Sequence, residues 1–131
     1  MTPELVALTF AILLGFAHLL IAANASTKIR GMDWNAGPRD EPQRPLTGTA
    51  GRLERAFRNY LETFAFFAAA VLIAHLANRH NAFTIYGAWT YLGARAIYLP
   101  LYAAGVPYLR SVVWSVGFFA TLAILVGLYW P

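Results

Sequence analysis

Four long apolar segments constrain this chain more than any other feature. They run from about Glu4 to Thr27, Leu53 to Ala77, Phe83 to Ala104 and Tyr108 to Trp130. A helix needs about 20 predominantly apolar residues to cross the roughly 30 Å hydrocarbon core of a bilayer, and each segment is long enough. Charged residues make up only 12% of the chain, whereas a soluble domain usually has about 25%. The sequence therefore predicts an all-α integral membrane protein, a single domain over residues 1–131 in which four antiparallel transmembrane helices form a bundle.

The first segment has a competing interpretation as a cleaved signal peptide. Ala23-Asn24-Ala25 has the small-residue form of a cleavage site, but the start Met1-Thr2-Pro3-Glu4 lacks the positive region that such a peptide needs. We therefore expect the first segment to remain in the protein as a helix.

Composition excludes several other classes of protein and site. The chain has no cysteine, which excludes disulfides, thiol nucleophiles and iron–sulfur clusters. Its basic residues are nine arginines and Lys28, scattered through apolar sequence without the basic run of a nucleic-acid-binding protein. We expect no bound metal, because His75 and His80 lack the carboxylate partners of a metal site. His18, in the middle of the first segment, is expected to be packed and hydrogen-bonded.

The basic residues are unevenly shared between the two ends of the predicted bundle. The second connection holds Arg79 alone, whereas the first and third connections and their flanks hold Lys28, Arg30, Arg39, Arg44, Arg52, Arg55 and Arg110. Lysine and arginine near helix ends favour the cytoplasmic side of a membrane. We therefore expect the long loop over residues 28–52 in the cytosol and both termini outside it, as in a multi-pass protein of a bacterial inner membrane.

Each of the last three segments carries polar residues on one helical face. The stripe on the second segment consists of Arg52, Arg55, Arg58, Asn59 and Glu62. The third segment carries Arg95, Tyr98 and Tyr102, and the first turn of the fourth carries Arg110, Ser111 and Trp114. With the orientation above, all three sets lie in the cytosolic half of the membrane. An ionisable group deep in a bilayer costs about 2.5–3.5 kcal/mol on insertion scales, so a functional role is expected of these groups.

This combination of residues suits an anionic, peptide-like ligand. A guanidinium pairs with a carboxylate through two hydrogen bonds and stays charged at any physiological pH. The alternative is that Arg55, Arg58 and Glu62 only neutralise one another between the helices. Positive charge would remain in excess even so, and a lipid phosphate is a second candidate occupant.

The polar stripes resemble those of a known family. The run RLERAFRNYLE at residues 52–62 resembles the signature at the start of the second membrane helix in the MAPEG family, the membrane-associated proteins in eicosanoid and glutathione metabolism. The runs ARAIYLPLY at residues 94–102 and RSVVW at residues 110–114 resemble the family's third and fourth helices. The resemblance covers nearly the whole chain.

The resemblance implies a homotrimer of four-helix subunits, with the co-substrate glutathione bound between neighbouring subunits in a site open to the cytosol. The residues that would bind glutathione are Arg55, Arg58, Asn59 and Glu62, together with Arg95, Tyr98, Tyr102 and Trp114 and with Arg30 of the next subunit. Arg110 would hold the thiolate, with Ser111 as its hydroxyl neighbour, because a guanidinium favours the ionised form of a thiol whose pKa is about 8.5. The thiolate would then attack a lipophilic small molecule arriving from the bilayer.

Two departures from the family's pattern bear on the second substrate. Tyr98 stands where some eicosanoid-processing members have a histidine, and Trp114 stands where they have a tyrosine that positions glutathione. The loop segment over residues 37–42 also resembles that of a bacterial branch of the family. The resemblance therefore implies a glutathione transferase or peroxidase of a bacterial type, and eicosanoid synthesis is not inferred. The alternative is a non-catalytic protein that binds a phospholipid headgroup in the same pocket. A small transporter is disfavoured, because no polar residues continue to the other side of the membrane.

Overall fold

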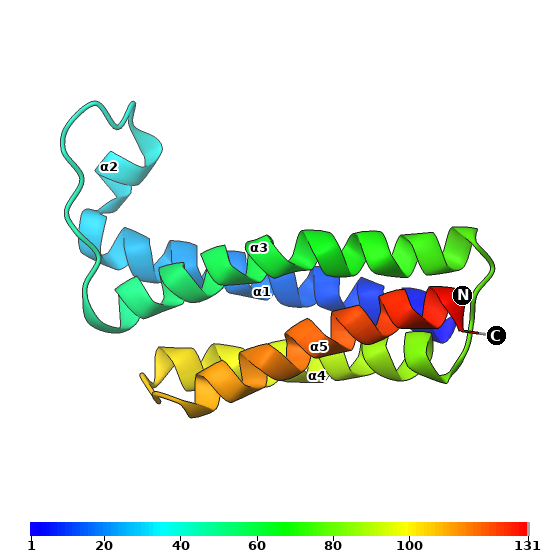
Figure 1. The fold of residues 1–131 in the computed structure, drawn as a ribbon. Coiled ribbons are helices and arrows are strands. Elements are labelled where there is room, and N and C mark those ends of the chain that lie inside the picture. Colours follow the sequence, from blue (N-terminus) through cyan, green and yellow to red (C-terminus); the bar gives the residue numbers. More distant parts are fainter. Residues whose placement is uncertain (131) are drawn as a thin grey trace.

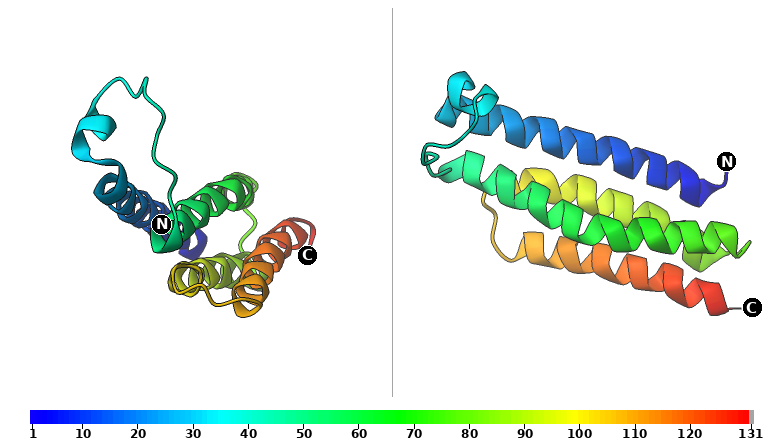
Figure 2. Two further views of the ribbon diagram at one scale, coloured as in Figure 1. Left: turned by 90° about the vertical axis from the view of Figure 1, so that its left-hand side faces the viewer. Right: turned by 90° about the horizontal axis from the view of Figure 1, so that it is seen from above.

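The chain forms four long helices and one short helix in a computed structural model that describes residues 1–130. The long helices α1 (Pro3–Arg30), α3 (Gly48–Leu76), α4 (Ala82–Ala103) and α5 (Leu109–Tyr129) run side by side, and α2 (Met32–Ala36) projects sideways beyond the end of α1 (Figure 1). Both chain termini and the α3–α4 turn lie at one end of the bundle, here called the terminal end. The α1–α3 loop and the α4–α5 turn lie at the other, the loop end (Figure 2).

The long helices follow the order of the predicted segments, but α1 and α3 extend further at the loop end. α1 continues to Arg30 and α3 begins at Gly48, so the predicted loop over residues 28–52 is shorter and contains α2. The polar residues of these turns interrupt the apolar pattern, which is why the predicted segments are shorter than the helices. Lys28 and Arg30 nevertheless suit the last turn of α1, because the carbonyl end of a helix is negative. The bounds of α4 and α5 differ from the prediction by one residue at each end.

α4 begins with hydrogen bonds that also tie it to the end of α5. The Asn81 side chain accepts from the backbone N–H groups of Phe83 and Thr84, at 3.0 and 3.2 Å, and the Asn81 backbone N–H donates to Thr84 Oγ1 at 2.9 Å. This capping box satisfies donors that the start of a helix leaves unpaired. Asn81 Nδ2 donates to the carbonyl oxygen of Gly127 at 2.8 Å, so the α3–α4 turn is attached to α5 as well.

Small residues make the contacts between the long helices. The buried core is rich in alanine and contains Ala7, Ala11, Ala70, Ala74, Ala88 and Ala120. Lipid tails are as apolar as leucine, so helices in a membrane associate through close packing of small residues and through hydrogen bonds. The core also contains Phe67, Tyr91 and Ile124. Many other large apolar side chains point outward, among them Phe10, Phe16, Phe118 and Phe119. This inside-out distribution is what a lipid environment favours.

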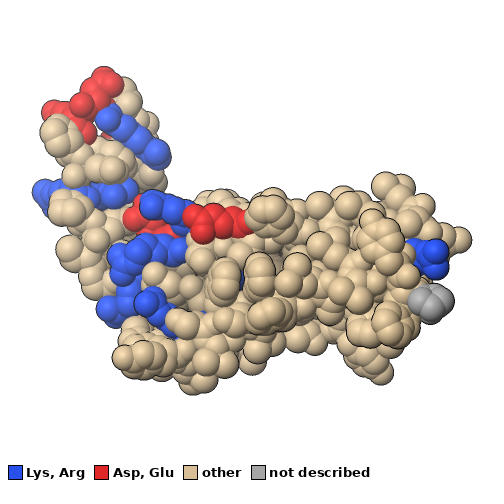
Figure 3. Space-filling model, in the orientation of Figure 1, with Lys and Arg blue, Asp and Glu red and all other residues tan. Residues whose placement is uncertain are grey.

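Length and composition support a membrane span for three of the long helices. Within residues 1–130, α1, α3 and α5 are long and apolar enough to cross a bilayer, and α4 is not by the same measure. α4 has 22 residues but carries Arg95, Pro100 and four tyrosines. Charged side chains gather over the loop end of the face shown in Figure 3.

The contact between α4 and α5 allows a matched pair of substitutions in one helix. A Cβ atom at Gly87 would lie 2.8 Å from the carbonyl oxygen of Ala120 and 2.8 Å from Cγ1 of Ile124, whereas a Cβ atom at Gly93 would meet nothing within 4 Å. We expect Gly87→Ala to destabilise the protein by about 1–3 kcal/mol through overpacking. Gly93→Ala should be neutral or stabilising by up to about 1 kcal/mol, because alanine favours the helix. Thermal unfolding in detergent compares them, and equal melting temperatures would contradict the close α4–α5 packing.

Candidate functional site

A pocket of about 580 Å³ lies between α3, α4 and α5 in the half of the bundle nearer the loop end. α3 contributes Arg55, Arg58, Asn59 and Glu62, α4 contributes Tyr98 and Tyr102, and α5 contributes Arg110, Ser111, Trp114 and Ser115. Residues three, four and seven apart lie on one face of a helix, which is why each helix supplies a compact set. The pocket thus brings together all the predicted site residues except Arg30 and Arg95. Ser115 was not predicted, although it lies one turn beyond Ser111 on the same face.

Tyr102 contacts two arginines, Arg55 and Arg110, at one wall of the pocket. Arg55 Nε donates to the Tyr102 hydroxyl at 3.3 Å, and the Arg110 guanidinium carbon lies 4.6 Å from the centre of the Tyr102 ring. A cation over an aromatic face is attracted by the ring's electrons without being neutralised. Arg55 and Arg110 form no ion pair with a carboxylate of residues 1–130. Their charge therefore remains available to an anion.

The carboxylates near the pocket do not neutralise the arginine stripe as the alternative interpretation required. Arg58 pairs with Glu54 at 3.3 Å, one turn away on the exposed side of α3. Glu62 lines the pocket and makes no ion pair within the part of the chain that the structure describes. An exposed pair such as Arg58–Glu54 contributes about 0–1 kcal/mol and can exchange readily for a ligand.

Arg95 lies behind the pocket wall rather than in it. Its side chain is only 1% exposed, and its Nη2 donates to Asn59 Oδ1 at 2.8 Å. Its guanidinium carbon lies 4.6 Å from the centre of the Tyr98 ring. Both residues that Arg95 touches here line the pocket. Helical periodicity placed Arg95 on the same face as Tyr98 and Tyr102. It could not distinguish residues that line the pocket from residues buried behind them.

The buried layer continues from Arg95 to α1. The Arg95 guanidinium carbon lies 5.5 Å from the centre of the Tyr60 ring, and the His18 ring stacks on Tyr60 at 4.6 Å. The expectation that His18 is packed is therefore confirmed. The expectation that it is hydrogen-bonded is wrong for residues 1–130, where neither of its ring nitrogens has a partner.

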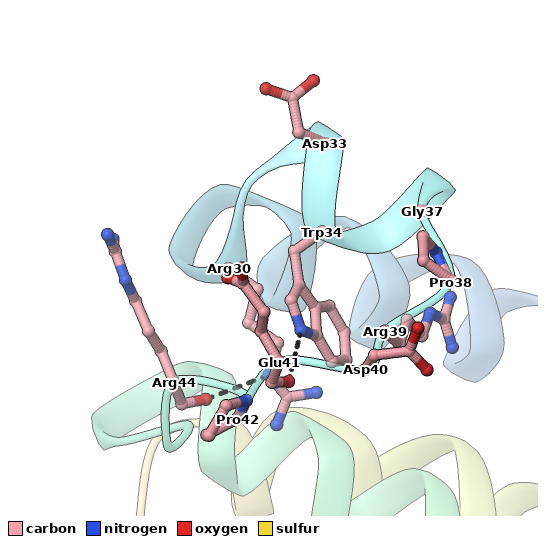
Figure 4. A pocket seen from close by; sticks show the side chains of 10 residues that line it. All are labelled: Arg30, Asp33, Trp34, Gly37, Pro38, Arg39, Asp40, Glu41, Pro42 and Arg44. Atoms are coloured by element: carbon pink, nitrogen blue, oxygen red, sulfur yellow. Dashed lines mark hydrogen bonds between the residues drawn. The ribbon is translucent and has the colours of Figure 1, made fainter.

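Arg30 lies in a second pocket, at the root of the α1–α3 loop. This pocket has a volume of about 530 Å³ and is lined entirely by residues 30–44 (Figure 4). Arg30 Nε donates to the carbonyl oxygen of Arg44 at 3.0 Å, and the guanidinium groups of Arg30 and Arg39 each lie 5.2 Å from the Trp34 ring. Arg30 therefore does not reach the α3–α5 pocket of its own chain, and its role in a neighbouring subunit's site stays a prediction.

Comparison with known proteins gives one match. The model of the MAPEG family matches residues 5–130, nearly the whole chain. No curated protein and no solved structure matches the chain significantly.

Proposed function

The chain belongs to the MAPEG family of membrane proteins, and we propose that it is a glutathione-dependent transferase or peroxidase acting on a lipophilic substrate. The observation that carries the proposal is the cationic wall of the α3–α5 pocket, where Arg55 and Arg110 share Tyr102 and pair with no carboxylate of residues 1–130. Glutathione is a tripeptide anion with two carboxylates, one ammonium group and one thiol. The residues of this pocket supply a partner for each of these groups.

The α3 residues are suited to the peptide part of glutathione. Arg55 and Arg58 would bind its carboxylates through paired N–H donors, which a carboxylate accepts with good geometry. Glu62 would accept the ammonium group, since it makes no ion pair among residues 1–130. Asn59 presents an amide whose oxygen already accepts from Arg95, which leaves its N–H₂ group to donate to a peptide oxygen.

Arg110 and Ser111 are suited to the sulfur. Both lie in the first turn of α5, where the positive end of the helix dipole adds positive potential. A neighbouring cation lowers the pKa of a thiol below the usual value of about 8.5 and so raises the fraction of nucleophilic thiolate. In the transferase reaction the thiolate forms a carbon–sulfur bond with the electrophile, and the leaving group departs with the bonding electrons. In the peroxidase reaction two glutathiones reduce a hydroperoxide to an alcohol and water and are oxidised to the disulfide.

The proposal includes a homotrimer in a bacterial inner membrane, with the loop end in the cytosol. The distribution of basic residues, of which Arg79 alone lies in the α3–α4 turn, supports this orientation. Membership of the family supports the homotrimer. Arg30 would complete the site of the adjacent subunit, and the lipophilic substrate would arrive from the bilayer.

A phospholipid phosphate is the second candidate occupant, because Arg55 and Arg58 are exposed at the loop end. Mass spectrometry of the detergent-purified protein, before and after washing with glutathione, distinguishes the two ligands. Release of bound lipid by millimolar glutathione, or absence of stoichiometric lipid, supports the glutathione site. Stoichiometric lipid that glutathione does not displace would favour a lipid-binding protein.

Transport remains disfavoured, because the apolar layer of Phe67, Ala70, Ala74 and Ala88 separates the pocket from the terminal end.

A further inference from the structure

A buried carboxyl group lies at the terminal end, far from the pocket. Glu4, in the first turn of α1, is 1% exposed. Its Oε1 accepts from Thr84 Oγ1 at 2.7 Å and lies 3.2 Å from Nδ1 of His80. Within residues 1–130 its Oε2 has no hydrogen-bond partner. His80 therefore has a carboxylate neighbour that sequence spacing did not indicate, since Glu4 reaches it from 76 residues away in the sequence.

The contacts of Glu4 join three helices at this end. Thr84 belongs to the capping box that starts α4, and Asn81 of the same box donates to the carbonyl oxygen of Gly127 near the end of α5. A hydrogen bond to a charged group is stronger than one between neutral groups, and it gains further in a low-dielectric surrounding. Glu4 thus attaches the first turn of α1 to the hydrogen-bonded junction of α4 and α5.

α1 is attached to the rest of the bundle unevenly along its length. Two residues of α1 make side-chain hydrogen bonds to α3, α4 or the α3–α4 turn among residues 1–130. One is Glu4, which contacts Thr84 and His80, and the other is Ala11, whose carbonyl oxygen accepts from the Tyr60 hydroxyl. The last turns of α1 bond instead to the α1–α3 loop, through Thr27, Ile29 and Arg30. The last buried residue of α1 is Ala22, which is 7% exposed. The terminal end of α1 is therefore fixed by polar contacts, while its loop end is tied mainly to its own loop.

We propose that Glu4, Thr84 and His80 form a latch that fixes the terminal end of α1 as a pivot, about which the loop end of α1 moves together with the α1–α3 loop. Arg30 lies in the last turn of α1, so the motion would carry Arg30 toward or away from a bound anion. This functional consequence rests on the proposed glutathione site, whereas the latch itself does not.

Single cysteines test the latch directly, because the chain has none of its own. Ala7→Cys reports on the latched part of α1, where Ala7 is 0% exposed, and Ala22→Cys reports on the loop half. The measurement is the rate of modification by a small maleimide in detergent. Glu4→Gln should raise the rate at position 7 about tenfold, because the neutral amide loses the charge-assisted part of the hydrogen bonds to Thr84 and His80. Thr9→Val is the matched control, because the Thr9 hydroxyl donates only to Leu5 of its own helix.

Equal rates at position 7 in the Glu4→Gln and Thr9→Val proteins would overturn the latch. If Glu4→Gln does not yield a monodisperse protein, His80→Ala removes one partner at a more exposed position and should raise the rate at position 7 about threefold. An unchanged rate would equally overturn the latch. S-hexyl glutathione should slow modification at position 22 and leave position 7 unchanged. If the ligand has no effect on thermal stability while Glu4→Gln still accelerates position 7, the latch stands and the proposed function fails. If the ligand stabilises the protein but protects position 7 as strongly as position 22, the pivot is wrong and the glutathione site stands.

Discussion

Replacing Arg110 with alanine should lower the turnover of a lipophilic electrophile by about 10²–10³-fold, the usual loss when one group that stabilises a developing or reacting anion is removed. Arg110 lies in the first turn of α5, and its guanidinium stacks on the Tyr102 ring of α4. Arg110 pairs with no carboxylate of residues 1–130. Its charge is therefore free to stabilise a thiolate in the pocket. The measurement is kcat with saturating glutathione, together with the oligomeric state from size-exclusion chromatography.

Two variants control this experiment. Arg110→Lys keeps a positive charge and should retain more activity than Arg110→Ala. Arg39→Ala removes an exposed arginine of the α1–α3 loop, which hydrogen-bonds only to Asn35 and lies over the Trp34 ring. This change should leave kcat within about twofold of the original. Unchanged turnover in the Arg110→Ala protein, with the assembly intact, would exclude a role for this residue at the sulfur.

Replacing Arg95 with methionine should weaken glutathione binding about tenfold or more without lowering the stability of the ligand-free protein by a comparable amount. Arg95 holds the oxygen of Asn59 at 2.8 Å and supports the Tyr98 ring from behind. Losing a charged hydrogen bond that orients a binding group costs about 1.5–3 kcal/mol. The buried guanidinium also leaves Nε and Nη1 without partners among residues 1–130, so methionine removes an unfavourable burial as well.

A glutathione titration followed by thermal unfolding measures both effects of Arg95→Met. Because Arg95 acts through Asn59 and Tyr98, we expect KM for glutathione to rise more than kcat falls. Arg52→Met is the matched control, since Arg52 bonds to the carbonyl oxygen of Ala103 and to Thr49, outside the pocket. An unchanged glutathione affinity in Arg95→Met would show that Asn59 and Tyr98 need no support from Arg95.

Helical periodicity was sufficient to predict most of the α3–α5 pocket. Residues such as Arg55, Asn59 and Glu62 recur at helical spacing, and the order of the helices places their stripe at the same depth as Tyr102 and Arg110. The apolar segments likewise indicated the long helices, because few polar residues interrupt them. Both signals are local in sequence and need no knowledge of how the helices pack.

The contacts between distant residues could not be predicted in this way. The pairing of Glu4 with Thr84 and His80 depends on how α1 meets the α3–α4 turn, and the burial of Arg95 depends on the rotation of α4 against α3. Helix ends were also missed where polar side chains belong to a helix, as at Arg30 in the last turn of α1 and Thr49 in the first turn of α3. These features follow from tertiary packing, to which a single sequence gives no direct signal.

The most direct test of the central claim is the thermal stability of the detergent-purified protein during titration with glutathione. An S-alkyl glutathione and a control tripeptide with an ordinary α-linkage in place of the γ-linkage are titrated alongside it. A ligand that binds only the folded state adds about 2.7 kcal/mol at 100 times its Kd. The account predicts a saturable stabilisation by glutathione and its S-alkyl derivative that the control tripeptide does not reproduce. No stabilisation at millimolar glutathione, or the same stabilisation by the control, would contradict it.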